Sequence, residues 1–118
     1  MSYIDAFVLP LAKKNLPAYT KMSKAASKVW MEHGAVDYRE CVVEDPKPGF
    51  GMPFPTLVKA KKGEVVVFSW IMYKSRAHRD RVNAKVMKDP RLAAMCKGPM
   101  PFDMERMTTG GFKVFVKP

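Results

Sequence analysis

The stretch EVVVFSWIMY, residues 64–73, constrains the fold most, because apolar residues occupy both of its alternating faces. Successive side chains of a strand point to opposite faces of its sheet. A strand that is apolar on both faces is typical of the centre of a sheet covered on both sides. This stretch therefore predicts a central strand, and the KKGE segment before it, residues 61–64, predicts a turn.

Two helices are predicted by apolar residues that recur at helical spacing. The first covers residues 16–33, with Asn15 as its N-cap. The second covers residues 76–88 and begins after Ser75, a residue type that caps helix N-termini. It must end before Pro90, because the residue that precedes a proline is disfavoured in helical conformation.

Three further strands are predicted at residues 3–10, 35–45 and 106–116. Shorter elements follow from local composition, a strand over residues 56–60 and a helix over residues 90–96. The PKPGFGMPFP segment, residues 46–55, is a loop rich in proline and glycine. Loops of this length are often lids or partner-binding arms, and a plain connector is the alternative.

The resulting order, strand–helix–strand–strand–helix–strand, is that of an α+β, ferredoxin-like βαββαβ protomer. Residues 1–118 suit one domain, with an antiparallel sheet and both helices on one of its faces. The other face is also apolar, so it requires a cover. A homodimer that closes sheet on sheet, as in a dimeric α/β barrel, is the simplest solution.

The charge balance favours anionic partners without specifying one. Against 21 basic residues the chain has 11 acidic ones, a net charge of +10. Nucleic acid ranks last among the partners, since no aromatic RNA-binding signature is present and the sheet face is expected to be covered. We expect a cytoplasmic protein that does not enter a membrane, because neither a membrane span nor a signal-peptide pattern is visible.

Four strings resemble a known family over nearly the whole chain: DAFVLP, WMEHGAVDYREC, VVFSWIMYKSRAHRDRVNAKVMKDPR and MPFDMERMTTGGF. The chain resembles the YbaA-like family of small bacterial proteins of unknown function, in the dimeric α/β-barrel superfamily. The resemblance implies a βαββαβ protomer and a barrel-like homodimer, and it brings no reaction. The superfamily includes cofactor-independent monooxygenases, isomerases and haem-degrading enzymes, several of which hold substrate between helices and sheet.

No cofactor or metal is expected. The haem-ligating histidine of the haem-degrading enzymes would fall near Met95, and the two histidines of this chain are His33 and His78. Cys41 and Cys96 stand alone, so ligand spacing for zinc or iron is missing and reduced thiols are expected.

A candidate site is predicted where the central strand meets the second helix. His78 shares the helix face of the apolar stripe and lies in the first turn, where neutral imidazole is favoured. It is a candidate base, and the alternative is a histidine that only packs on the sheet. Arg79 and Asn83 flank it as donors for a carbonyl or carboxylate oxygen, over Trp70 as a stacking surface.

Asp5 and Tyr38 complete the candidates. A carboxylate in the apolar strand at residues 3–10 is costly unless it is paired, so Asp5 is either a base with a raised pKa or half of a salt bridge. Tyr38 either stacks a flat ligand or belongs to the core.

Two functional hypotheses follow, and whether the protein is an enzyme stays open. The first is a homodimer that binds a small apolar or aromatic ligand between helix and sheet, as a cofactor-independent monooxygenase or isomerase if it is an enzyme. The second is a non-enzymatic binding or interaction module that uses its basic surface for RNA or another anionic partner.

Overall fold

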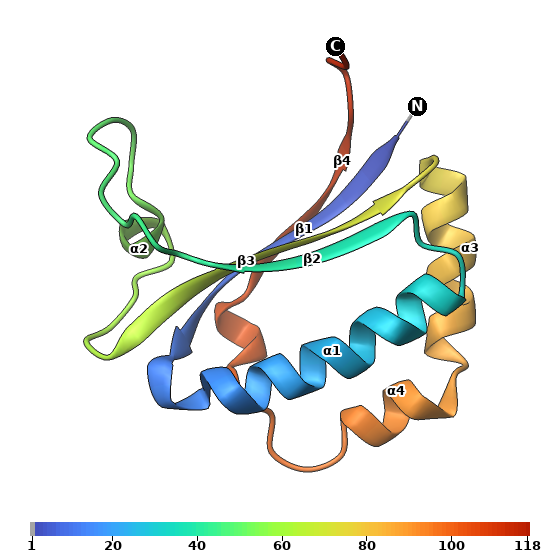
Figure 1. The fold of residues 1–118 in the computed structure, drawn as a ribbon, viewed down its shortest axis with the longest axis horizontal. Coiled ribbons are helices and arrows are strands. Elements are labelled where there is room, and N and C mark those ends of the chain that lie inside the picture. The colour runs from blue at the N-terminus through green and yellow to red at the C-terminus, as the bar shows by residue number, and fades with distance from the viewer. Residues whose placement is uncertain (1) are drawn as a thin grey trace.

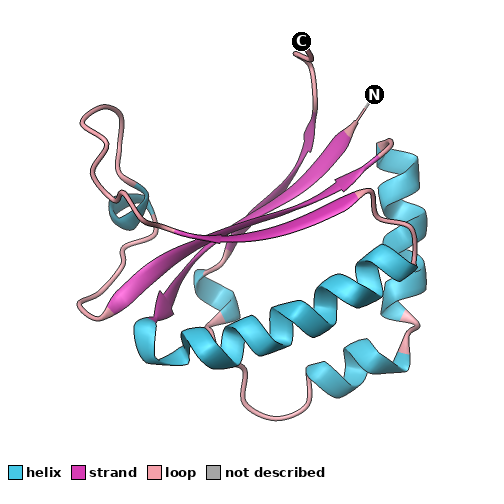
Figure 2. Ribbon diagram, in the orientation of Figure 1, coloured by secondary structure: helices cyan, strands magenta, loops and turns pink. Residues whose placement is uncertain are grey.

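The computed structural model describes residues 2–118 as a four-stranded antiparallel sheet in the order β2-β3-β1-β4. The strands are β1 (Tyr3–Ala12), β2 (Asp37–Val42), β3 (Glu64–Tyr73) and β4 (Thr108–Lys113). The helices are α1 (Leu16–Glu32), α2 (Phe54–Leu57), α3 (Arg76–Met87) and α4 (Pro90–Met95), with 3-10 turns η1 (Lys13–Asn15) and η2 (Met104–Arg106). Both long helices lie on one side of the sheet (Figures 1 and 2), which confirms the ferredoxin-like prediction.

The predicted short strand over residues 56–60 is wrong, because this segment consists of the end of helix α2 and the turn that follows it. Pro53 precedes the helix and Pro55 stands in its first turn, where a fixed φ and a missing N–H cost little. Asn15 occupies the N-cap position of α1 as predicted, but its side chain makes no capping hydrogen bond, and its amide donates instead to the Pro101 carbonyl at 3.1 Å.

Pairing between β1 and β3 sets which side chains face the helices. Asp5 pairs with Ile71, and Ala6 pairs with Trp70. Because side chains alternate along a strand, Asp5 and Ile71 share the helix-covered face, and Trp70 shares the opposite face. That opposite face is apolar and partly exposed, with 40% of Phe68 and 58% of Phe112 accessible to solvent.

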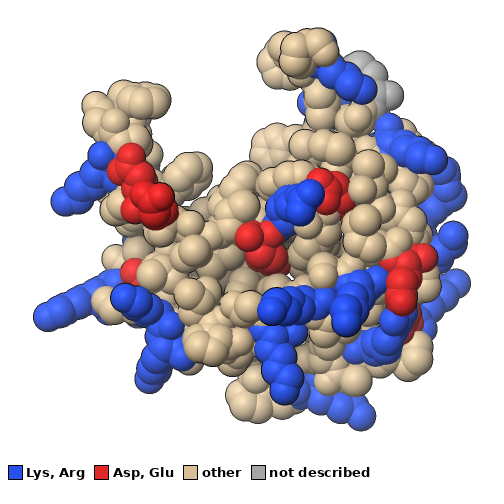
Figure 3. Space-filling model, viewed as in Figure 1, with Lys and Arg blue, Asp and Glu red and all other residues tan. Residues whose placement is uncertain are grey.

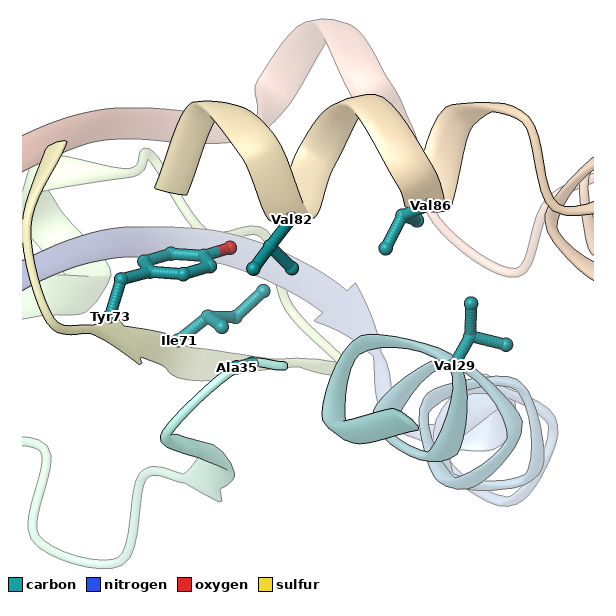
Figure 4. Close-up of a cluster of buried hydrophobic side chains, with 6 residues drawn as sticks. All are labelled: Val29, Ala35, Ile71, Tyr73, Val82 and Val86. Atoms are coloured by element: carbon teal, nitrogen blue, oxygen red, sulfur yellow. The ribbon is translucent and has the colours of Figure 1, made fainter. Parts of the chain in front are cut away.

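One core cluster fixes α3 on the sheet. Val82 and Val86, one helical turn apart, are buried against Ile71 and Tyr73 of β3 (Figure 4). Val29 of α1 closes the same cluster, which joins the two long helices. A second cluster, built from Leu9, Leu11, Tyr19 and Val67, packs the other end of α1 on the sheet.

The start of α3 is capped as predicted. The Ser75 side chain accepts a hydrogen bond from the His78 backbone N–H at 3.1 Å, which satisfies one of the free donors of the first turn. At the other end, Asp89 caps α4 and its carboxylate lies 2.8 Å from His33 Nε2. This contact ties α4 to the end of α1 and so holds α4 beside the space between helices and sheet.

Candidate functional site

A cavity of about 420 Å³ lies between α1, the sheet and the segment from α4 to η2. Its walls are mainly apolar and include aromatic side chains from β1 and α1, Phe7 and Trp30. Six methionines contribute to the walls: Met22, Met87, Met95, Met100, Met104 and Met107. Methionine side chains are flexible and polarisable, so a wall made of them can adapt to ligands of different shape.

The charged group in this cavity is a carboxylate held by two tyrosines, and we call Tyr19, Tyr38 and Glu40 the Glu40 cluster. Tyr19 donates its hydroxyl to Glu40 Oε1 at 2.8 Å, and Tyr38 donates to Oε2 at 2.9 Å. Burial and the Glu40 charge both raise the pKa values of the two phenols. Among the described residues that line the cavity, Glu40 is the only one with a charged side chain.

The Glu40 cluster also opens toward the outside of the molecule. A second hollow of about 350 Å³, between α1 and the edge strand β2, is lined by the same three residues. The buried Ser23 lines both spaces, and the exposed Lys24 lines the outer one. The carboxylate can therefore be approached from within the cavity and from the β2 edge.

A second polar group lies farther along the helix–sheet space, and we call Asp5, Arg79 and Asn83 the Asp5 cluster. The Arg79 guanidinium donates to Asp5 Oδ1 at 3.0 Å. Asn83 Oδ1 accepts two hydrogen bonds, from Trp30 Nε1 at 3.1 Å and from the Tyr73 hydroxyl at 3.2 Å. Four elements, β1, α1, β3 and α3, are thereby joined through polar groups.

Burial dominates the ionisation of Asp5. The side chain lies in a mostly covered position, and desolvation raises its pKa above the ordinary value although Arg79 opposes the shift. Arg79 also stacks on the Tyr3 ring at 5.1 Å, and its Nε lies 2.9 Å from Asp80 Oδ1 at an angle that makes no hydrogen bond. Of the two sequence alternatives for Asp5, the structure thus shows the ion pair together with a raised pKa.

The two clusters line neighbouring hollows. A hollow of about 370 Å³ is lined by Asp5, Arg79 and Asn83, and it shares Phe7, Trp30, Ile71 and Met87 with the larger cavity. The wall that the two hollows share is therefore apolar, and each hollow has one polar cluster.

His78 is placed beside this space and not in its lining. Its Nδ1 accepts the backbone N–H of Lys74 at 3.0 Å, and its ring meets the Tyr73 ring edge-on at 6.0 Å. Partial burial comes first among the causes that lower its pKa, followed by the nearby charges of Lys74, Arg81 and Lys85. Neutral imidazole is favoured, as the sequence predicted, with a contact pattern typical of a structural histidine.

The expectation that Trp70 lies against His78, Arg79 and Asn83 is wrong. Trp70 pairs with Ala6 and points to the sheet face opposite the helices, because the alternation of β3 separates it from Ile71. The tryptophan that contacts Asn83 is Trp30 of α1.

Sequence reasoning placed Arg79 and Asn83 with His78, treated Asp5 separately, and missed Glu40 and Tyr19. A signal for the Glu40 cluster was available. Tyr38 and Glu40 are two residues apart on a strand and so share a face. On α1, polar Tyr19 and Ser23 stand one helical turn apart.

Charge is unevenly distributed over the surface. Figure 3 shows basic side chains along the side that carries α1, where Lys21, Lys24 and Lys28 are exposed. Within residues 2–118, no group of three potential metal ligands comes together, and no helix has the length and apolar character required to cross a membrane. The acidic Glu40 thus sits inside a protein whose outside is strongly basic.

Comparison with known proteins gives a family match over most of the chain. The model of a family described as "Protein of unknown function (DUF1428)" matches residues 2–104. The chain is 40% identical over 116 residues to "Uncharacterized protein YbaA" of Escherichia coli (strain K12), covering 98% of each protein.

Solved structures share the fold at low sequence identity. A dimeric ferredoxin-like protein from an uncultured marine organism has a TM-score of 0.63 at 13% identity, with 99% of this chain and 98% of that chain covered. A NIPSNAP domain protein from Burkholderia xenovorans has a TM-score of 0.61 at 16% identity, with coverage of 98% and 95%. These likenesses support the fold assignment.

Proposed function

Because the chain belongs to the DUF1428 family of proteins of unknown function, we propose its function from the site itself: it binds a small apolar or aromatic molecule in the cavity between the helices and the sheet. The observation that carries the proposal is the cavity of about 420 Å³ with apolar walls and one charged group. Ligand sites of proteins are typically clefts of about 300–1,000 Å³ with apolar walls and few polar groups.

The wall composition supports an adaptable binding site. The space is open to solvent on one side, and two of its methionines, Met87 and Met104, are largely exposed. The methionines that line it come from α1, α3, α4 and the segment that follows α4. Their flexible side chains favour binding of related molecules over recognition of one rigid shape.

Binding has more support than catalysis. His78 uses Nδ1 for a backbone N–H and does not line the cavity. Asp5 is the better placed of the two candidate bases, and Arg79 already engages it. For a monooxygenase or isomerase, proton transfer would pass through Asp5. Deuterium incorporation from D₂O into a bound carbonyl compound, lost in Asp5→Asn, is the result that would favour an enzyme.

The binding proposal is tested with N-phenyl-1-naphthylamine, a neutral probe that fluoresces in apolar surroundings. We expect saturable fluorescence with the wild type. Ala26 lines the cavity and Ala25, its neighbour on α1, is exposed. Ala26→Phe should therefore remove the signal, and Ala25→Phe should keep it. Equal probe binding by these two variants, both folded by circular dichroism, would overturn the proposal.

We further propose that the protein is a homodimer closed over the uncovered sheet face. Phe68, Trp70 and Phe112 make this face apolar, and contiguous exposed apolar surface favours association. The loop of residues 43–53 and the C-terminal segment project away from the side covered by α1 (Figure 1), and they expose Phe50 and Phe115. These two projections fit the role of arms that hold a second copy.

The dimer is tested by light scattering after gel filtration. Phe68→Glu would place a charge in the contact and should give a monomer. Lys21→Glu changes charge on the exposed face of α1 and should leave the dimer intact. A monomeric mass for the wild type at micromolar concentration would contradict the proposal.

A further inference from the structure

We infer that the cavity selects ligands that carry a protonated amine on an aromatic or apolar body, with Glu40 as the group that binds the amine. This inference rests on the proposed binding function and names the class of ligand. It starts from the carboxylate, whose two oxygens accept hydrogen bonds from Tyr19 and Tyr38 at 2.8 and 2.9 Å.

Glu40 lacks the partner that a half-buried carboxylate normally has. In residues 2–118 no lysine, arginine or histidine forms an ion pair with it. Lys24 lines the outer hollow beside it with an exposed side chain, and the two form no ion pair. Charges removed from water are normally paired, so the cluster has room for a cation from outside the chain.

Each carboxylate oxygen keeps capacity for a further donor. An ionised carboxylate offers about four acceptor sites over its two oxygens, and the two phenols use one on each. An ammonium group donates up to three hydrogen bonds and can take the remaining sites. Hydrogen bonds between ionised partners are roughly twice as strong as neutral ones.

Aromatic rings in the walls of the cavity that contains Glu40 favour the same chemistry. The Trp30 and Tyr38 rings are 6.3 Å apart and tilted by 51°, and Tyr19 meets Phe102 edge-on at 5.7 Å. The faces of such rings attract cations, and tryptophan does so best. A carboxylate with several aromatic side chains therefore combines direct pairing with cation–π attraction.

The contrast with the rest of the protein sharpens the inference. The chain has a net charge of +10, yet Glu40 is the only charged residue among the described residues that line the large cavity. A site for an anionic ligand would place a basic group there. The arginine of the interior, Arg79, is engaged with Asp5 in the neighbouring hollow.

The test uses three molecules with the same indole ring: tryptamine, its neutral alcohol tryptophol, and the anion indole-3-acetate. Each competes with N-phenyl-1-naphthylamine at fixed salt. We expect tryptamine to displace the probe at least about tenfold better than tryptophol, with indole-3-acetate weakest. Glu40→Gln should remove the preference. Glu44→Gln makes the same charge change at an exposed position and should keep it.

Each outcome decides between the two proposals. Equal displacement by tryptamine and tryptophol would overturn the amine inference and leave the binding cavity standing. If the neutral probe does not bind at all, the binding of tryptamine alone is measured by calorimetry. The absence of any heat of binding would then overturn both the binding proposal and the amine inference. Should Glu40→Gln fail to fold, the tryptamine-to-tryptophol ratio of the wild type is sufficient, because it needs no variant.

Discussion

The Asp5 and Glu40 clusters line two neighbouring hollows between the helices and the sheet, and their carboxylates are hydrogen-bonded in different ways. Asp5 is paired with the guanidinium of Arg79, and the neighbouring Asn83 joins Trp30 and Tyr73. Glu40 is held by two neutral phenols and no cation within the described part of the chain. A buried charge without its counter-charge is costly. The first cluster contains its own counter-charge, and we propose that a ligand supplies the counter-charge of the second.

The difference also predicts that the Asp5 cluster mainly stabilises the fold and that the Glu40 cluster mainly affects ligand binding. The Asp5 cluster links four elements and brings Arg79 of α3 against β1, so losing a member should disturb the fold. The Glu40 cluster links α1 to an edge strand and opens toward solvent through the outer hollow. Its loss should change what binds more than how stably the chain folds.

Arg79→Met should produce the largest loss of stability. It leaves Asp5 without its cation, and removal of one partner from a buried pair typically costs about 3 kcal/mol. Urea unfolding at neutral pH measures the loss. Arg76→Met, on an exposed position of the same helix, is the control and should change the free energy of unfolding by less than about 0.5 kcal/mol.

The loss in Arg79→Met should shrink in acid. The pKa of Asp5 is already raised by burial, and without Arg79 it should rise further. A raised pKa in the folded state means that the stabilising contribution is present at low pH, where Asp5 is protonated, and is lost as pH rises through that pKa. Unfolding curves that show the same difference between variant and wild type at every pH would contradict an uncompensated Asp5.

The sequence was sufficient for the order of elements and for the helix that bears Arg79 and Asn83, because these depend on local periodicity. The sequence was insufficient to predict the sheet face to which Trp70 points. β3 is apolar on both faces, so its pattern does not say which face the helices cover. The Glu40 cluster was missed because its members come from α1 and β2, and only tertiary packing brings them together. The helix at α2 was taken for a strand because short apolar runs fit both structures.

Gly111→Ala should have an intermediate effect at the Asp5 cluster. A methyl group at Gly111 would lie 2.9 Å from Tyr3 Cζ and closer still to the Tyr3 hydroxyl, which must then move. Since the Tyr3 ring stacks on Arg79, displacement of Tyr3 weakens that contact. Overpacking of this kind lowers the free energy of unfolding by about 1–2 kcal/mol. Gly110→Ala is the control, because a methyl group at Gly110 would meet only the Phe112 side chain, at 3.4 Å. Its free energy of unfolding, measured by heat or urea, should change little.

Glu40→Gln should have the smallest effect on stability, about 1 kcal/mol or less. The amide oxygen still accepts from one tyrosine, and its N–H can donate to the hydroxyl of the other, since a phenol oxygen also accepts. A second measurement follows the phenols directly. The Glu40 charge raises the pKa values of Tyr19 and Tyr38, so in the variant their ionisation, followed by ultraviolet absorbance, should begin at lower pH. A loss of stability as large as that of Arg79→Met would instead show that Glu40 stabilises the fold as much as Asp5 does. The proposed difference in role between the two clusters would then be wrong.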